Sequence, residues 1–577
     1  MKNKWNCIFW TLLIMMLGCN HTKVNPDTTE LNVLITSFEE HQGFDRLRYP
    51  LGLYTKEYYH KEAIFADSLI LELSQLDTTG LNEIDLISVT LLNFVLQEKI
   101  DFYSYGRYLN PILSDAGFHS NLTYQVKPLN DFAQVKSYLN KLNALPEFVD
   151  QHFINLRVGL EKGVSQPLVI FRGYESTYED HIVSSYDQSY YYEPFKKLPK
   201  GLTENQKDSV LVAAKLAIET QVIPQFIRIK DFFESVYLPN TRTTLGVSEI
   251  PNGLDYYQNR IDFYTTSTEY TAESIHQIGL SEVSRIRTQM EQVIEGLEFK
   301  GSFEDFLTFL RTDKQFYATT PKELLMIARD MAKRVDAQLP RFFKTLPRKP
   351  YGVAPVPDAI APKYTGGRYV GTDAQSTEPG YYWVNTYNLP SRTLYTLPAL
   401  TVHEAVPGHH LQGSLNAELG ESIPQFRRDL YLSAYGEGWG LYSEFLAEEM
   451  GMYTTLYEQF GKLTYEMWRA CRLVVDTGIH AKGWTRDQVV HFMSVNTALS
   501  LHEINTETDR YISWPGQALS YKIGELKIRE LREKAEEALG SKFDIRDFHE
   551  VILAQGTVTL SIMELRVKAY IEAQKFN

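Results

Sequence analysis

Residues 403–410 read HEAVPGHH, and this stretch decides how the whole sequence is interpreted. It begins as the HExxH pattern, in which two histidines four residues apart on one helical face bind a metal ion beside the glutamate. Position 407, where the second histidine belongs, is proline, and Gly408 follows it. Proline lacks an N–H, and its ring crowds the carbonyl four residues earlier. The stretch is therefore either a metal site built around a bend or a histidine-rich loop.

Helix geometry ranks the candidates for the second ligand. At 1.5 Å rise per residue, an unbroken helix would place His403 and His410 about 10 Å apart along its axis. Two nitrogen ligands of one zinc ion lie only about 3–3.5 Å apart. If Val406 and Pro407 form a kink or bulge, the remaining residues read as HExGH. We therefore predict His403 and His409 as metal ligands, His410 as the second-ranked ligand, and Glu404 as the catalytic base.

The third ligand is predicted from residues 434–444, which read AYGEGWGLYSE. Glu437 lies between two glycines in a helical pattern, where each glycine costs about 1 kcal/mol relative to alanine. Glycines are retained at such positions where another helix or a ligand approaches closely. Glu444 follows seven residues later on the same face, where it can hydrogen-bond a ligating histidine or serve as a second-ranked ligand. We predict one Zn²⁺ ion held by His403, His409 and Glu437.

The composition indicates a large, acidic, folded protein. The chain has 577 residues, is 44% hydrophobic and 13% aromatic, and carries a formal net charge of −14. That length and apolar content suffice for a large core. Because the chain is acidic and lacks a dense Lys/Arg block, nucleic acid is not an expected partner. The composition does not predict an oligomeric state.

The first residues resemble a bacterial lipoprotein signal. Lys2 and Lys4 precede an apolar run of about ten residues, too short to span a bilayer as a stable helix. The run ends in Met16-Leu17-Gly18-Cys19, which resembles a lipobox. We predict a signal peptide over 1–18, a lipidated tether over 19–34, and membrane contact only through the lipid on Cys19. The expected location is the bacterial cell envelope, on a periplasm-facing outer membrane; the alternative is a plain secretory signal.

Helical periodicity dominates the rest of the chain. Apolar residues recur at three- and four-residue steps over 272–297 and over 65–76, 82–103, 131–162, 203–236, 303–311, 321–337, 485–500 and 525–537. Residues 380–387 are aromatic and β-branched, which predicts a strand. We predict a mainly α fold with an N-terminal helical lobe over 35–250 and a catalytic helical lobe over 251–577, both packed as one unit.

The two histidine and glutamate segments carry a family resemblance. HEAVPGHHLQ followed by YGEGWGLYSE resembles a family of uncharacterised bacterial exported proteins, a domain of unknown function, with the motif HEAxPGHH. That family is similar to the glutamate-zincin (gluzincin) metallopeptidases. The Gly-Glu-Gly-Trp stretch resembles the third-ligand segment of zinc aminopeptidases. The Gly408-His409 pair resembles that of helical dipeptidyl carboxypeptidases and oligopeptidases. The resemblance implies a two-lobed zinc-peptidase-like architecture with a deep cleft and a small β edge near the active site.

A second resemblance covers residues 502–521, which read HEINTETDRYISWPGQALSY. Similar helical carboxypeptidases have a histidine, an Arg-Tyr pair about ten residues later, and then a glutamine. The resemblance implies that His502 and Tyr511 donate hydrogen bonds to the oxyanion, with Tyr521 as a further catalytic donor. It also implies that Arg510 and Gln517 bind substrate. The alternative is that the tyrosines pack around a proline turn.

The predicted strand next to the histidine motif has two interpretations. In similar peptidases an edge strand beside the zinc helix pairs with the extended substrate backbone. By that analogy Asn385 and Thr386 contact substrate. The alternative is a strand with a structural role only.

The sequence thus predicts a zinc metallopeptidase of carboxypeptidase or oligopeptidase type that hydrolyses short peptides. Two alternatives stay open. One is a helical envelope lipoprotein that binds peptide or glycan for uptake without catalysis. The other is a zinc amidase that acts on cell-wall peptides, because its metal chemistry would be the same.

Overall fold

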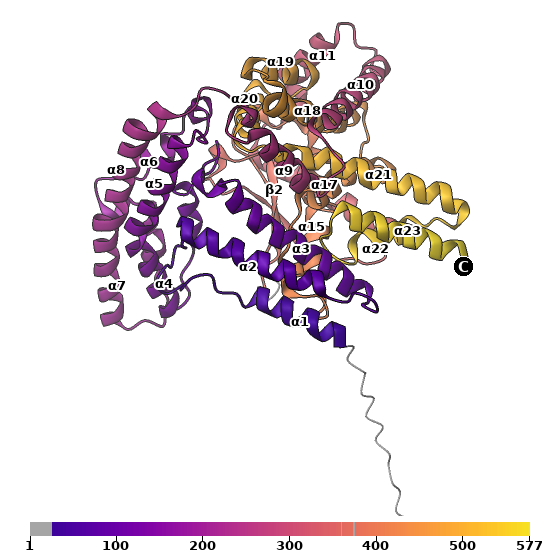
Figure 1. Cartoon of the computed structure of the whole chain (residues 1–577). Helices are drawn as coiled ribbons and strands as arrows, with labels where there is room; N and C mark the ends of the chain where they lie inside the picture. Colours follow the sequence, from indigo (N-terminus) through magenta and orange to yellow (C-terminus); the bar gives the residue numbers. More distant parts are fainter. Residues whose placement is uncertain (1–25, 359, 373–375, 577) are drawn as a thin grey trace, which may run out of the picture.

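The structure, a computed structural model, describes residues 26–358, 360–372 and 376–576, and helices account for most of it (Figure 1). The predicted signal peptide 1–18 and Cys19 lie outside the described residues. Helix α1 (Pro26–Glu39) begins inside the predicted tether, and Leu31 and Leu34 of this helix are buried. An apolar face of α1 thus packs against the body within the range predicted for the tether.

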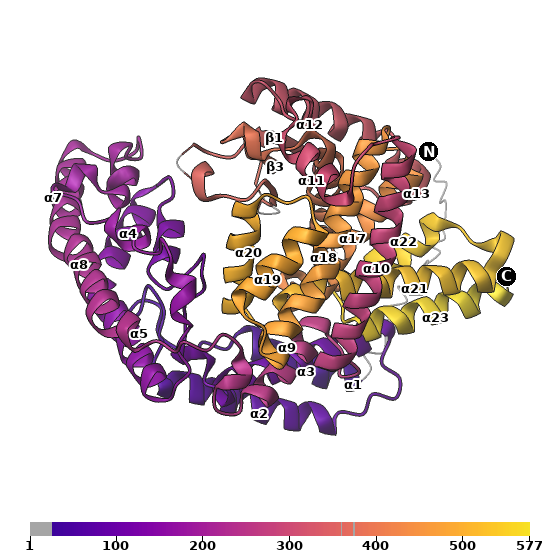
Figure 2. The same cartoon turned by 90° about the horizontal axis from the view of Figure 1, so that it is seen from above.

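The N-terminal part contains two groups of helices. Helices α1, α2 (Lys56–Gln75) and α3 (Glu83–Ser104) lie along the body, whereas a second group forms an arm beside it (Figure 2). The arm contains α4 (Phe132–Asn143), α5 (Leu145–Glu161), α6 (Ser176–Glu179), α7 (Glu204–Ala217) and α8 (Ile223–Phe232). The helix predicted over 131–162 is two helices, because Pro146 in the first turn of α5 cannot continue α4.

The body follows as a series of helices interrupted by one sheet. Its helices are α9 (Gly253–Thr265), α10 (Ala272–Gly296), α11 (Phe303–Thr312), α12 (Pro321–Asp336), α13 (Leu339–Phe342), α14 (Leu397–Glu404), α15 (His409–Ala417), α16 (Gln425–Asp429), α17 (Ser433–Glu449), α18 (Leu456–Lys482), α19 (Arg486–Asn496), α20 (Leu501–Ser513), α21 (Ser520–Leu539), α22 (Ile545–Leu553) and α23 (Leu560–Phe576). Helix α18 packs along α10, and α17 packs along α21.

The hydrophobic cores do not divide at residue 250. One buried cluster runs from Ile112 in the N-terminal part to Ala518 in the C-terminal part. A second runs from Leu31 to Ile571 and joins α1–α3 to α17, α21 and α23. The described chain is therefore one packed unit, in which segments from both predicted lobes complete each core.

One helical stretch in the arm meets the length and composition criteria for crossing a membrane. It spans Glu204–Asn240 and has a mean hydropathy of 1.4 in its most apolar window. Phe226 and Phe233 in this stretch are fully buried in the first core cluster. A buried core helix meets the same criteria, so the stretch is weak evidence for a membrane span.

The small sheet corrects the prediction of an edge strand at 380–387. It has the order β1 (Tyr351–Pro355), β3 (Gly380–Val384), β2 (Gly367–Val370). Strand β3 pairs parallel with β1 and antiparallel with β2, so both of its edges are occupied. The strand at the sheet edge next to α14 is β2. The local sequence predicted the strand, but its place in the sheet depends on long-range pairing.

Candidate metal centre

The HEAVPGHH stretch forms two helices joined by a bend. Helix α14 ends at Glu404 and α15 begins at His409. The Val406–Pro407 peptide bond is cis, and the Gly408 N–H donates to the Val402 carbonyl over 3.0 Å. The bend brings the His403 and His409 rings to a centroid distance of 4.8 Å, nearly perpendicular to one another. Two histidines six residues apart thus meet at one point.

Close packing fixes this bend. A Cβ atom at Gly408 would lie 1.9 Å from the His403 carbonyl oxygen, so only glycine fits at this position. The Trp439 indole N–H donates to the Pro407 carbonyl over 2.8 Å. Helix α17, which carries Glu437, therefore also holds the loop that carries the histidines.

Three ligand atoms converge at this point. Glu437 Oε2 lies 3.5 Å from His403 Nε2 and 3.4 Å from His409 Nε2. Ligand atoms of these three residues all lie within 4.8 Å of one another. Tetrahedral ligands at about 2.0–2.2 Å from a zinc ion lie about 3.3–3.6 Å apart. The two pairs that include Glu437 thus have the spacing of ligands of one zinc ion, and nitrogen and oxygen donors suit zinc and other divalent metals.

The carboxylates around His403 determine the charge of the group. Glu444 Oε1 lies 2.8 Å from His403 Nδ1, which is the contact that the seven-residue spacing predicted. Burial lowers the pKa of His403, but Glu437 and Glu444 outweigh it and raise this pKa to about 10. Burial raises the pKa of Glu437, but the two histidines hold it well below its usual range. The site is therefore built around a carboxylate that stays ionised, and a metal ion would displace the proton of His403.

The glycines of α17 mark close approaches, as predicted. A Cβ atom at Gly438 would lie 2.6 Å from Gly524 Cα in α21, and one at Gly440 would lie 2.7 Å from the His403 ring. At Gly436 it would lie 2.4 Å from the Tyr431 ring. Each glycine makes room for a residue that positions the site.

Two tyrosines that the sequence did not indicate position the carboxylates. The Tyr431 hydroxyl donates to Glu437 Oε1 over 3.1 Å, which leaves Oε2 facing the histidines. The Tyr369 backbone N–H in β2 donates to Glu404 Oε2 over 2.8 Å. Neither residue carries a local signal, because each is brought in by tertiary packing.

Arg368, next to Tyr369, also lies near the carboxylates. Burial lowers the pKa of Arg368, but Tyr364 and Glu404, followed by Tyr521 and Glu437, outweigh it and raise this pKa. Arg368 is nevertheless exposed to solvent. Arg368 is thus a cation at the edge of the site that the sequence analysis did not identify.

His410 lies outside the group of three ligands. Its Nδ1 is 3.1 Å from the Tyr369 hydroxyl and 3.2 Å from Ser414 Oγ. Burial lowers the pKa of His410 to about 4. It is therefore a neutral packing residue, and the structure brings His409 rather than His410 to the carboxylate.

The predicted oxyanion donors differ in where they lie. The Tyr511 hydroxyl accepts hydrogen bonds from Trp468 Nε1 (2.8 Å) and Arg472 Nε (2.9 Å) and is buried. The Tyr521 ring lies 4.4 Å from the same Arg472 guanidinium, and its hydroxyl is close enough to the site to raise the pKa of Tyr431. His502 is exposed in the first turn of α20. Tyr521 thus lies near Tyr431 and so near Glu437, and its ring shares the Arg472 guanidinium with Tyr511.

The predicted substrate-binding residues make contacts within the protein. Arg510 donates to Gln517 Oε1 over 2.8 Å and approaches Glu507 at 3.3 Å. Asn385 is fully buried, and its amide donates to the backbone carbonyls of residues 361, 364 and 365. Thr386, just beyond β3, is partly exposed. Asn385 therefore fastens a turn of the chain, and its side-chain amide is engaged by the backbone.

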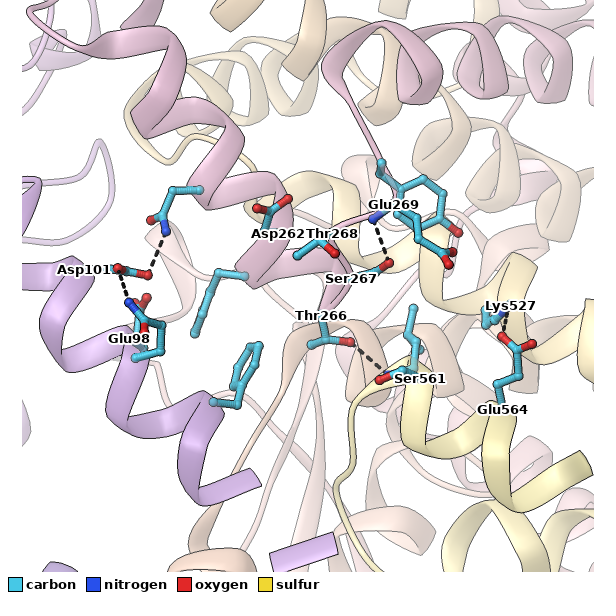
Figure 3. Close-up of a pocket in the computed structure, with 16 residues that line it drawn as sticks. Glu98, Asp101, Asp262, Thr266, Ser267, Thr268, Glu269, Lys527, Ser561 and Glu564 are labelled. Atoms are coloured by element: carbon cyan, nitrogen blue, oxygen red, sulfur yellow. Dashed lines mark hydrogen bonds and ion pairs between the residues drawn. The ribbon is translucent and has the colours of Figure 1, made fainter. Parts of the chain in front are cut away.

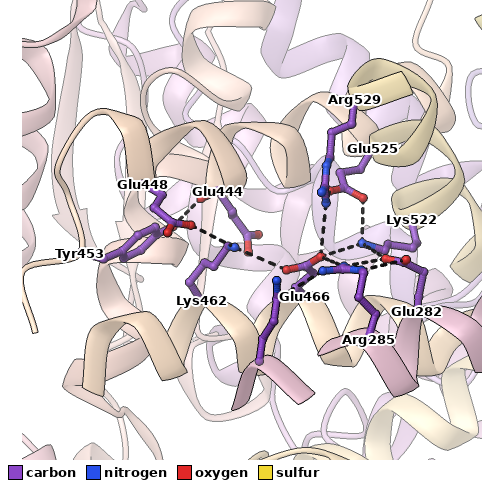
Figure 4. A network of polar contacts seen from close by, with 11 residues as sticks. Glu282, Arg285, Glu444, Glu448, Tyr453, Lys462, Glu466, Lys522, Glu525 and Arg529 are labelled. Atoms are coloured by element: carbon purple, nitrogen blue, oxygen red, sulfur yellow. Dashed lines mark hydrogen bonds and ion pairs between the residues drawn. The ribbon is translucent and has the colours of Figure 1, made fainter. Parts of the chain in front are cut away.

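Buried ion pairs lie at Glu444 and in the core beside it (Figure 4). Arg469 Nη2 lies 3.5 Å from Glu444 Oε1. Farther along, the fully buried Lys522 ammonium lies 2.8–3.0 Å from carboxylates on three helices, Glu282 on α10, Glu466 on α18 and Glu525 on α21. Buried charges persist only when they are paired, so this network fixes how the helices around α17 pack. The Lys522 ammonium is therefore paired within the core.

Solved structures share this fold. A crystal structure from Colwellia psychrerythraea, described as a "putative lipoprotein", matches with a TM-score of 0.84 and 26% identity over 95% of this chain and 99% of that chain. A "putative lipoprotein of unknown function" from Shewanella oneidensis matches with a TM-score of 0.67 and 17% identity over 93% of this chain and 97% of that one. The second likeness, at its low identity, shows the fold alone. No curated protein matches the chain.

The sequence profile of one family matches residues 39–567, which is nearly the whole chain. The description of that family is "Bacterial protein of unknown function (DUF885)". This protein therefore belongs to the DUF885 family of bacterial proteins of unknown function.

Proposed function

We propose that this protein is a zinc-dependent peptidase that hydrolyses short peptides. One observation carries the proposal: two imidazole nitrogens and a carboxylate oxygen converge within 4.8 Å, next to Glu404. A catalytic zinc site needs about three protein ligands, an open position and a nearby carboxylate base. A protein that only binds peptide or glycan would leave Glu404 without a role.

The residues divide into ligands and a base. His403, His409 and Glu437 would hold the ion, which when bound supplies a Lewis acid that polarises the scissile carbonyl. Glu404 accepts the proton of the attacking water and delivers it to the leaving amine. The Tyr369 N–H fixes Glu404 Oε2, so the other oxygen is free for this proton among the described contacts.

Residues on neighbouring helices and strands would bind the oxyanion and the substrate. Tyr521 donates a hydrogen bond to the oxyanion that develops on the carbonyl. The extended substrate backbone lies along the outer edge of β2, where the Tyr369 N–H donates to Glu404, rather than along β3. Arg368 on the same strand offers a cation to substrate carboxylates.

The proposed location is the cell envelope. Two structural relatives are described as lipoproteins, and the start of this chain resembles a lipobox ending at Cys19. We propose a lipid on Cys19 that anchors the protein to the outer membrane, facing the periplasm.

The test combines metal analysis with peptide hydrolysis. The purified mature protein should contain about one zinc per chain and cleave a mixed peptide pool, and a chelator should abolish cleavage. Glu404→Gln should keep the zinc and lose about 10²–10⁴-fold in rate. His409→Ala should lose the zinc, whereas the matched variant His410→Ala should keep it. If Glu404→Gln cleaves like the wild type, the mechanism is wrong. Cleavage of cell-wall peptides alone would favour the amidase.

A further inference from the structure

A separate cavity lies where α3, α9, α21 and α23 meet (Figure 3). Its volume is about 560 Å³, and none of the three metal-ligand candidates lines it. Small-molecule sites have volumes of about 300–1,000 Å³. The cavity is thus large enough for a ligand of its own.

The lining carries an excess of negative charge. Five carboxylates and one ammonium, that of Lys527, line the cavity. Glu98 is paired with Arg260 at 2.7 Å, and Glu564 is paired with Lys527 at 2.6 Å. In the part of the chain that the structure describes, the other three carboxylates have no ion-pair partner; they are Asp101, Asp262 and Glu269. The cavity therefore favours a cation.

Two of these carboxylates are held in place. Asp101 accepts hydrogen bonds from Gln97 (2.9 Å) and Asn259 (2.7 Å), one on each oxygen. Asp262 accepts one from Gln258 over 2.8 Å, on Oδ1 alone. Asp262 is half-buried, and its burial and the nearby Asp101 raise its pKa and outweigh the Gln258 hydrogen bond and Arg260, which lower it. A positive group between the two would relieve this repulsion.

The rest of the lining indicates what kind of cation fits. Phe94 and Phe263 stack at a centroid distance of 5.5 Å with an interplanar angle of 16°, and Tyr270 lines the same cavity. Aromatic faces attract organic ammonium and guanidinium groups and also bury their carbon atoms. Among the described residues, three metal-ligand atoms come together only at His403, His409 and Glu437. The lining thus suits an organic cation better than a metal ion.

We propose that this cavity binds a small aliphatic amine, with its ammonium at Asp101 and Asp262 and its carbon chain on Phe94 and Phe263. Glu269 lies farther along the cavity in the view of Figure 3 and would receive a second ammonium. Diamines therefore fit better than monoamines. This site is independent of the metal centre and of the proposed peptidase activity.

Calorimetric titration of the mature protein tests this inference with 1,5-diaminopentane as the probe. Its uncharged analogue 1,5-pentanediol and the dianion glutarate serve as comparisons. The diamine should bind and the other two should not. Asp262→Asn should weaken diamine binding at least about tenfold, because a neutral amide replaces the carboxylate that pairs with the ammonium. Asp255→Asn on the same helix is the matched control, because Asp255 is exposed and does not line the cavity.

The outcomes separate the proposal from its alternatives. Zinc content should be unchanged in every variant, since no metal ligand lies here. If Asp262→Asn does not fold, as judged by circular dichroism, Glu269→Gln replaces it, because Glu269 is exposed. The proposal is overturned if the diol binds as well as the diamine, if Asp255→Asn weakens binding equally, or if no diamine binds up to about 10 mM.

Discussion

The contact between Gly440 and the His403 ring gives a prediction whose size follows from the geometry. A Cβ atom at position 440 would lie 2.7 Å from Cε1, 2.8 Å from Nε2 and 3.1 Å from Nδ1 of this ring. Carbon contacts are favourable at about 3.5–4.0 Å, so Gly440→Ala must displace the ring by about 0.7–1 Å. Metal–ligand distances tolerate only about 0.2 Å. The displaced Nε2 therefore no longer matches His409 and Glu437.

Two effects of Gly440→Ala on folding nearly cancel. Overpacking a core costs about 1–3 kcal/mol, whereas alanine gains about 1 kcal/mol over glycine inside a helix. The free energy of unfolding of the metal-free protein should therefore fall by only about 0–2 kcal/mol. Zinc affinity should fall by about 10–100-fold, the loss seen when an outer partner of a ligand is removed. That loss corresponds to about 1.4–2.7 kcal/mol.

The assay is zinc titration in competition with a chromogenic chelator, together with urea unfolding of the metal-free proteins. Gly413→Ala is the matched control: it is also helical, but its Cβ would lie at an ordinary 3.8 Å from Tyr369 Cε1. This control should keep its zinc affinity and gain up to about 1 kcal/mol of stability. Wild-type zinc affinity in Gly440→Ala, or an equal loss in Gly413→Ala, would refute the reasoning.

Three further predictions concern the second partner of His403, the bend and the buried histidines. Glu444→Gln removes the charge 2.8 Å from His403 Nδ1 and should lower zinc affinity about 10–100-fold in the same titration; unchanged affinity with lower stability would make Glu444 only a core residue. Gly408→Ala should lower the free energy of unfolding in urea by more than about 2 kcal/mol, because its Cβ would lie 1.9 Å from the His403 carbonyl oxygen; an unchanged free energy would contradict this geometry. Burial lowers the pKa of His119 and His152 to about 3, so below pH 6.5 the unfolded chain binds protons that the folded chain does not. Stability should therefore fall as the pH drops from about 6.5 toward 3, by up to about 1.4 kcal/mol per pH unit for each histidine. In His152→Phe, the slope of the free energy of unfolding against pH, measured in urea, should decrease by about one proton. Phenylalanine fits this position because both ring nitrogens of His152 lack hydrogen-bond partners among the described residues and the ring stacks on Phe118. An unchanged slope would contradict this prediction.

The sequence predicted those features that depend on local geometry. Helical periodicity placed most of the long helices, because a face buried against a core must repeat every three to four residues. Pro407 required a break after Glu404, and the spacing of ligands around one ion then favoured His409 over His410. The glycines of α17 indicated close packing before any partner was known, and the structure supplies Gly524 and His403 as those partners.

Features set by long-range pairing were out of reach of the sequence. The strand at 380–384 was predicted, but its central place between β1 and β2 is decided by segments with weak strand patterns of their own. The two predicted lobes share their cores for a related reason. Leu31 and Ile571 share one core, and no local pattern reports which distant helix covers an apolar face.

The sequence likewise did not show which basic side chains lie at the site and which are buried in the core. Lys522 follows directly after the 502–521 segment, yet it is buried among three carboxylates. Arg368 carries no motif, yet it lies near Glu404 and Glu437. The difference comes from helix packing, because a lysine inside a helix interface must be neutralised by its neighbours.

Helix α17 connects this packing to the proposed chemistry. It carries Glu437, holds the bend through Trp439, and contacts the His403 ring at Gly440. On its other side Gly438 lies directly against Gly524 of α21. A shift of α21 would therefore move one ligand and the support of another together. The geometry of the metal centre thus depends on the core that holds α17 and α21 in contact, and its ligands cannot be varied independently of that core.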